Sequence, residues 1–206
     1  MGTDGHASTA AMQLRNDGQR YGALAQLLHW VIAALVVVMF VVGWYMTDLP
    51  LGPDKIKVYN LHKSFGVLIL ALMALRLLWR FTSPAPPLPA GMPGHERAAA
   101  TASHVLLYLL ILAQPVIGIL HSAAANFPVV VFGLFTLPAL AGPSEPLKDA
   151  LGAAHFWLGW AILGLVCLHV AAALRHHFLL KDDILRRMLP GQSQGASEGT
   201  SEGRSA

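Results

Sequence analysis

Four long apolar stretches dominate this 206-residue chain and restrict what it can fold into. A transmembrane helix needs about 20 consecutive, mostly apolar residues, and it satisfies its backbone hydrogen bonds within itself. Only 12% of the residues are charged, against about 25% in soluble domains. We therefore predict an all-α integral membrane protein, a four-helix bundle. The predicted spans are 23–46, 60–79, 103–122 and 151–174.

Polar segments flank these spans. Residues 1–20 lack the apolar core of a secretory signal, and the Gly/Ser-rich residues 191–206 have the composition of a disordered segment. We expect two disordered cytoplasmic tails around one four-span domain at 21–190. The apolar stretch at 127–142 contains two prolines and is too short to be a fifth span. We predict a loop on the membrane surface there, and the sequence leaves its role open.

The basic residues are distributed unevenly between the two sides that four spans define. Ten of the fourteen Lys and Arg residues fall on the side of the two termini. The four on the other side are Lys55, Lys57, Lys63 and Lys148. Because cytoplasmic segments carry the excess of basic residues, we predict that both termini are cytoplasmic. The net positive charge of +3 is then explained by the basic residues that orient the chain in the membrane. We therefore expect membrane lipid, and no nucleic acid, as a partner.

Histidines recur at two depths of these spans, although ionisable side chains are costly in lipid and mark function there. In the fourth span, HFWLGWAILGLVCLH places His155 at the outer end and His169 near the inner end. Fourteen residues of helix amount to about four turns, so both rings share one face, about 21 Å apart along the axis. Depth pairs His169 with His29 of the first span. It likewise pairs His155 with His62 of the second span. Two neutral imidazoles facing each other across a bundle can bind haem iron from both sides.

The same fourteen-residue offset relates two further positions to these histidines. Gly43 shares a face with His29, and Arg76 shares a face with His62. The first span should therefore have a side-chain gap at the outer level, and the second span a cation at the inner level. The Arg76 guanidinium either extends to the inner headgroups or pairs with a haem propionate.

Lys63 and His104 also admit two interpretations each. Lys63 follows His62 directly and is a candidate for contacts with the propionates of an outer haem, or a lysine at the membrane interface. His104 begins the third span at the inner level. It could replace His29 or His169 as a ligand, or it could serve a quinone or proton site, because histidine titrates near neutral pH.

The histidine-bearing segments, in their order and spacing, resemble the bacterial cytochrome b561 family. The matching pieces are QLLHW (26–30), YNLHKSFG (59–66), RLLWR (76–80), SHVLLYLLILAQPVIGIL (103–120), the histidine pair of the fourth span and LRHHFLLKDDILRRMLP (174–190). The resemblance covers about residues 20–190. It implies a membrane bundle with two haem b groups, whose iron ligands would be His29, His62, His155 and His169. His121 is not part of the family pattern, and its role is left open.

The resemblance also implies a function in the bacterial inner membrane. It implies electron transfer between the periplasmic side and the quinone pool, with superoxide oxidation coupled to ubiquinone reduction in some members. Other members are cytochrome b subunits of a periplasmic dehydrogenase or hydrogenase, so the donor is superoxide or a periplasmic redox partner. An oxidoreductase is therefore expected. A histidine-lined metal transporter is a further alternative, although its path would use acidic residues that the spans essentially lack.

Overall fold

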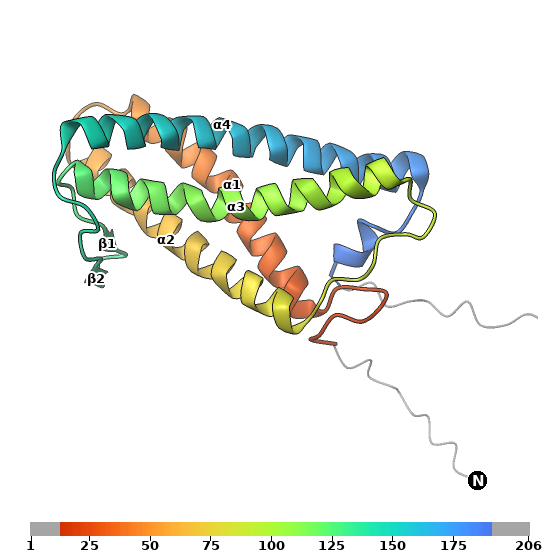
Figure 1. Cartoon of the computed structure of the whole chain (residues 1–206). Coiled ribbons are helices and arrows are strands. Elements are labelled where there is room, and N and C mark those ends of the chain that lie inside the picture. The colour runs from red at the N-terminus through yellow and green to blue at the C-terminus, as the bar shows by residue number, and fades with distance from the viewer. Residues whose placement is uncertain (1–12, 191–206) are drawn as a thin grey trace, which may run out of the picture.

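A computed structural model of the chain describes residues 13–190 and contains four long helices (Figure 1). These are α1 (Ala23–Asp48), α2 (Pro53–Thr82), α3 (Gly94–Ala124) and α4 (Glu145–Arg175). The shorter elements are β1 (Val130–Val131), β2 (Phe135–Thr136), the π-helical turn η1 (His176–Leu180) and the 3-10 turn η2 (Arg186–Met188). All four long helices are long and apolar enough to cross a membrane, which confirms the predicted fold class. The expected tail at 191–206, and most of the one at 1–20, lie outside the described residues.

α2, α3 and α4 begin before the predicted apolar spans, and local sequence signals account for the early starts of α2 and α4. Pro53 opens α2 at a position where a missing backbone N–H costs nothing. Ser144 caps α4, where its hydroxyl accepts a hydrogen bond from the Leu147 N–H. Glu145 in the first turn of α4 adds a favourable charge at that helix end. Each helix therefore continues past the apolar stretch into the interface.

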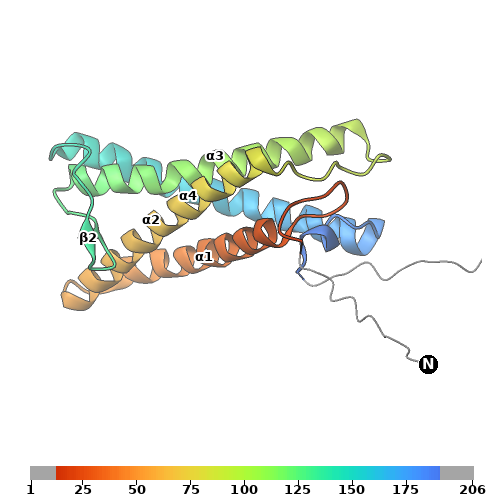
Figure 2. The ribbon, with the colours of Figure 1, turned by 90° about the horizontal axis from the view of Figure 1, so that it is seen from below.

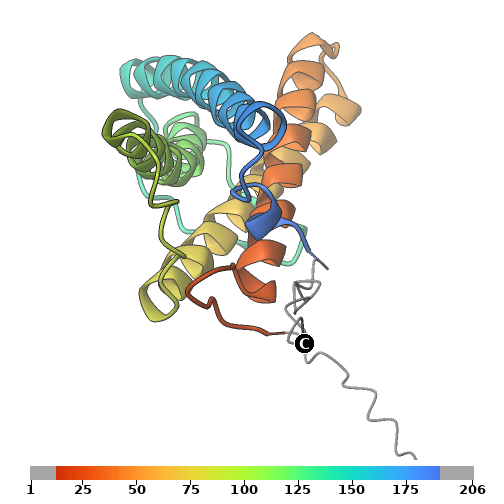
Figure 3. The ribbon, with the colours of Figure 1, turned by 90° about the vertical axis from the view of Figure 1, so that its right-hand side faces the viewer.

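The helices form two antiparallel pairs. α3 packs along α4, and α1 packs against α2, which crosses over to contact α3 as well (Figures 1 and 2). Figure 3 looks along the helices and shows the α3–α4 pair beside the α1–α2 pair. The buried centre consists of Leu28, Ile32 and Val36 of α1, Ile69 and Met73 of α2, and Ile162 of α4. These side chains separate the two ends of the bundle.

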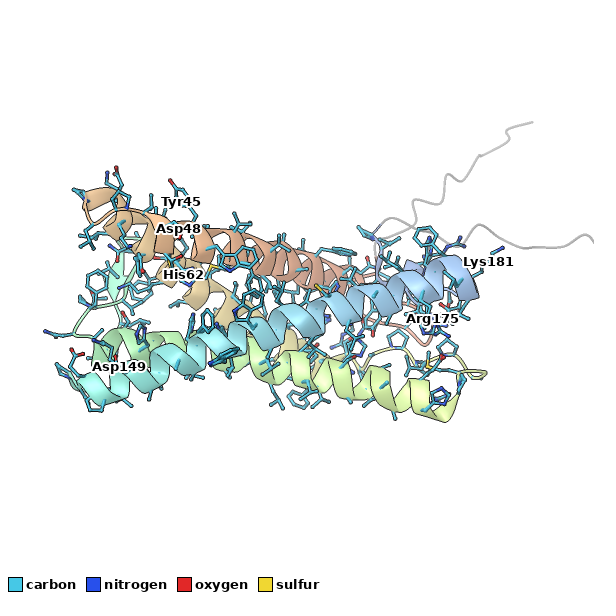
Figure 4. All side chains as sticks on the ribbon, turned by 90° about the horizontal axis from the view of Figure 1, so that it is seen from above. Tyr45, Asp48, His62, Asp149, Arg175 and Lys181 are labelled. Atoms are coloured by element: carbon cyan, nitrogen blue, oxygen red, sulfur yellow. The ribbon has the colours of Figure 1, made fainter. Side chains whose placement is uncertain are left out.

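Different residues mark the two ends of the bundle. Asp48, His62 and Asp149 lie toward one end, and Arg175 and Lys181 lie at the other (Figure 4). We call the first the outer end and the second, where residues 13 and 190 also lie, the inner end.

The 127–142 segment forms a hairpin at the outer end and not a fifth helix, as predicted. Val130 pairs with Thr136 and Val131 with Phe135. Gly133 adopts a φ of +74° in the turn, a conformation that glycine reaches without steric cost.

Two neighbouring residues of α2 attach this hairpin to the bundle. The Lys63 ammonium donates to the Pro128 carbonyl at 2.9 Å and lies 3.6 Å from the Phe127 ring centroid. The Ser64 hydroxyl, which is buried, accepts a hydrogen bond from the Phe132 N–H at 2.9 Å. The hairpin is therefore part of the helical structure and not a free loop.

The segment after η1 folds back under the inner end, which the sequence analysis did not anticipate. Lys181 has a φ of +56° and turns the chain. The Trp30 indole N–H of α1 then donates to the Met188 carbonyl at 2.9 Å, and the Gln26 amide donates to the Arg187 carbonyl at 3.2 Å. The chain end thus covers the inner end of α1.

Candidate functional site

Two histidine pairs connect helices that are far apart in the sequence. At the inner level, the rings of His29 on α1 and His169 on α4 lie 6.4 Å apart between centroids, at 61° between planes. At the outer level, the rings of His62 on α2 and His155 on α4 lie 6.3 Å apart, at 69°. The structure therefore brings together the same two pairs that depth along the helices predicts.

The spacing of each pair fits an ion held between the two rings. An imidazole nitrogen binds a first-row metal at about 2 Å and lies about 1.1 Å from its ring centroid, so a metal between two opposed imidazoles sets their centroids about 6 Å apart. Both observed spacings agree with this value. Haem iron accepts two axial histidines in this way, so the residues present fit a haem at each level.

The orientation of the two rings at the outer pair is also consistent with binding of a metal between them. The Nδ1 atoms of His62 and His155 are buried without a hydrogen-bond partner. The Cε1–Nδ1 edge of His155 faces Gly118 of α3, where an added Cβ would lie 3.1 Å from Cε1 and 3.4 Å from Nδ1. Because Nδ1 of each ring is buried, we expect Nε2 to be the nitrogen that a metal would contact.

Gly43 lies on the other side of the outer pair, as the fourteen-residue offset predicts. A Cβ at Gly43 would meet Cε1 of His62 at 3.6 Å, an ordinary contact. On α4, Gly159 lies beside the Gln114 amide of α3, 3.6 Å from where its Cβ would be, and this amide donates to the His155 carbonyl at 2.9 Å. This bond connects α3 to the part of α4 that carries His155.

His104 lies at the inner level, as predicted, but its distance differs from that of the pairs. Its ring centroid is 5.2 Å from that of His169, with the planes at 71°. This is about 1 Å shorter than the spacing expected for two rings that share a metal. The geometry therefore favours His29 over His104 as the partner of His169 and leaves His104 beside the inner pair.

The Arg76 side chain extends to α3 and to the inner end of α1. Its Nε donates to the Tyr108 hydroxyl at 3.1 Å, and its Nη1 donates to the Ala25 carbonyl at 3.2 Å. The guanidinium thus connects α2 to α3 and α1. Arg80, one turn further along α2, lies 6.0 Å from the Tyr108 ring centroid.

Lys63 and His121 both have contacts within the protein near the outer end. The Lys63 ammonium is engaged by the hairpin and by the Ser122 hydroxyl at 3.2 Å. His121 lies between α3 and α4 near the outer end, where an added Cβ at Gly152 would lie 3.2 Å from its Nε2. Neither side chain lies between the rings of the outer pair.

Three residues near the pairs were missed by the sequence analysis: Gly118, Gln114 and Tyr108. A signal for Gly118 was present, because it follows His104 by fourteen residues, the offset that relates the other paired positions. No comparable signal identifies Gln114 or Tyr108. Their roles depend on which side chains meet across the α3–α4 and α2–α3 contacts.

The fold and the two imidazole pairs define a class: a helical membrane protein whose facing histidines suit axial ligation of haem at two depths. The chain belongs to the prokaryotic cytochrome b561 family, whose model matches residues 20–191. It is therefore a membrane electron-transfer protein, and the family implies b-type haem.

Several curated proteins are similar over nearly their whole length. Cytochrome b561 homolog 2 of Escherichia coli (strain K12) is 42% identical over 180 residues, which cover 86% of this chain and 95% of that protein. The probable superoxide oxidase CybB of Yersinia pestis is 31% identical over 175 residues, covering 84% and 97%. Cytochrome b562 of Cereibacter sphaeroides is 29% identical over 175 residues, covering 82% and 94%.

Proposed function

We propose that the chain carries electrons across the bacterial inner membrane through two haem b groups. His29 and His169 would hold the inner haem, and His62 and His155 the outer one. The observation that carries this proposal is the matched spacing of the two ring pairs, 6.4 and 6.3 Å. Haem, when bound, supplies one-electron redox chemistry, and the protein supplies the axial ligands, the orientation and the surroundings.

The residues between the two pairs support transfer within the membrane. Ile32, Ile69, Met73 and Ile162 are buried in the apolar centre of the bundle and keep water out of the space between the two levels. Water-free surroundings keep the electrostatic influence of nearby charges strong. Arg76 at the inner level has the donor groups to bind a propionate, and it is placed between three helices to do so.

We further propose that electrons enter from the periplasmic side and reach ubiquinone. Superoxide is the donor suggested by the name of the Yersinia pestis relative. At the outer end, Lys57 is paired with Asp54, and Lys148 with Glu145. Lys55 and Lys63 donate to backbone carbonyls, so their charge is not cancelled by a carboxylate. These two cations would favour the approach of a small anion. A quinone or proton role for His104 is consistent with its place beside His169.

Haem content of the purified protein tests the ligand assignment. We expect about two haems per chain and the sharp reduced bands of low-spin b haem. His62→Ala or His155→Ala should remove one haem and leave the other, and His29→Ala or His169→Ala should remove the second. His104→Ala and His121→Ala are the matched controls and should keep both. Colourless wild-type protein would disprove the proposal, and loss of haem in His104→Ala with retention in His29→Ala would disprove the inner assignment.

The alternative functions predict different measurements. Steady-state superoxide consumption coupled to ubiquinone reduction would identify an enzyme acting alone. A cytochrome b subunit would instead show no superoxide consumption and would be reduced by a periplasmic dehydrogenase or hydrogenase. A metal transporter would bind zinc without colour. Within residues 13–190, no group of three His, Cys, Asp or Glu side chains is placed to hold such an ion.

A further inference from the structure

The two histidine pairs differ in the charges around them. The Arg76 Nη1 donates to the Ala25 carbonyl, one helical turn before His29, and its Nε donates to the Tyr108 hydroxyl, one turn after His104. Arg80 lies 6.0 Å from the centroid of the same Tyr108 ring. At the outer pair, Lys63 follows His62 in the sequence, but its ammonium donates to the Ser122 hydroxyl and to the Pro128 carbonyl of the hairpin. The two arginines therefore place fixed positive charge close to the inner pair.

The Arg76 charge is held in place and is not cancelled by the protein. Its two hydrogen bonds go to the neutral hydroxyl of Tyr108 and to the neutral carbonyl of Ala25. None of the ion pairs within residues 13–190 involves Arg76. In the partly buried interior of a membrane bundle, such a charge is screened much less than one at the surface.

A fixed cation stabilises the less positive state of a redox centre beside it. We propose that Arg76, positioned by Tyr108, raises the reduction potential of the inner haem above that of the outer haem and so favours electron movement from the outer to the inner end. This inference rests on the proposed function, because it requires haem at both pairs. Transfer of one electron makes the outer site more positive by one unit and the inner site less positive by one. It requires no proton and no change of bonds.

The direct test is a redox titration of the purified, haem-loaded protein with Arg76→Gln. Single-ligand variants, His29→Ala and His62→Ala, identify which potential belongs to which haem. We expect the equilibrium constant for reduction of the inner haem to fall about tenfold, which is about 59 mV for one electron. The outer potential should move much less.

Arg97→Gln is the matched control. Arg97 is also an arginine near the inner end, but it is exposed and donates to the Pro89 carbonyl at 3.1 Å. Its removal should leave both potentials unchanged. Arg76→Lys keeps the charge without the planar group, and its inner potential should stay closer to that of the wild type than to that of Arg76→Gln.

Arg80→Gln keeps the inference testable if Arg76→Gln fails to retain the inner haem. Arg80 lies on the same helix and influences the same level, so the inner potential should fall in the same direction by a smaller amount. An unchanged inner potential in the haem-retaining variants would overturn the proposal. Equal shifts in the reduction potentials of both haems would also overturn the proposal. A wild-type protein without haem would instead disprove the proposed function.

Discussion

At the scale of single residues, the outer pair depends on the absence of side chains as much as on its two histidines. Gly118 of α3 lies against the His155 ring, with only 3.1 Å between an added Cβ and Cε1. Few real Cβ contacts are this short, and a buried ring held by a metal cannot move freely. Gly43 lies less closely against His62, at 3.6 Å. The two glycines therefore differ in how much room they leave.

Gly118→Ala should displace the His155 ring and weaken the outer haem. Overpacking of this kind costs about 1–3 kcal/mol, and the ring can relieve it by turning away from the position that its partner His62 requires. We expect the haem content to fall from about two toward one per chain, or the spectrum of the outer haem to change. Absorption spectroscopy and haem extraction measure both.

Gly43→Ala is the control for this effect. Its Cβ would meet His62 at an ordinary van der Waals distance, so two haems and an unaltered spectrum are expected. If Gly118→Ala also keeps two haems with wild-type bands, the close approach of Gly118 has no role in placing the ring.

At the scale of elements, α2 carries the outer histidine His62 and the hairpin attachment on adjacent residues. His62 faces α4, while Lys63 and Ser64 bind the segment 127–136. The Ser64 hydroxyl also donates to the Asn60 carbonyl at 2.8 Å within α2. One turn of helix thus connects the outer pair to the hairpin that covers its flank.

Ser64→Ala should loosen the hairpin. The substitution removes the acceptor of the Phe132 N–H, and such a hydrogen bond contributes about 0.5–1.5 kcal/mol. Amide hydrogen exchange across residues 127–137 should become faster by up to about tenfold, because 1.4 kcal/mol corresponds to a factor of ten.

Ser103→Ala is the matched control, since the Ser103 hydroxyl bonds only to the Ala100 carbonyl of its own helix. It should leave exchange in the hairpin unchanged. Wild-type exchange in Ser64→Ala would show that the strands and Lys63 hold the hairpin without this serine.

The spans could be predicted because the length of an apolar run is a direct consequence of membrane thickness. The helix ends could not. The sequence from Pro53 to Tyr59 is polar enough to be taken for a loop, yet α2 begins at Pro53. The return of the chain to α1 through Arg187 and Met188 could not be predicted either, because isolated hydrogen bonds between distant segments leave no periodic pattern in the sequence.

At the scale of the whole molecule, helix geometry makes the paired sites predictable. The rise per residue is fixed, so depth along each span follows from counting, and His29 and His155 could be placed at their levels without a structure. Which side chains contact each other between neighbouring helices depends on how each helix is rotated about its axis and on the angles at which the helices cross. The contact of Arg76 with Tyr108 and the attachment of Lys63 to the hairpin are of this kind, and only the structure supplies them.

The orientation predicted for the whole bundle rests on its charges and can be tested without haem. Ten basic residues lie on the side of the termini and four on the other, and the basic side of short loops is retained in the cytoplasm. Alkaline phosphatase fused within 137–143 should be active, because it reaches the periplasm, whereas a fusion after Pro190 should be inactive. A fluorescent protein that folds only in the cytoplasm should give the reverse pattern and is the control for expression. Phosphatase activity after Pro190 would reverse the proposed orientation and place the His29–His169 pair on the periplasmic side.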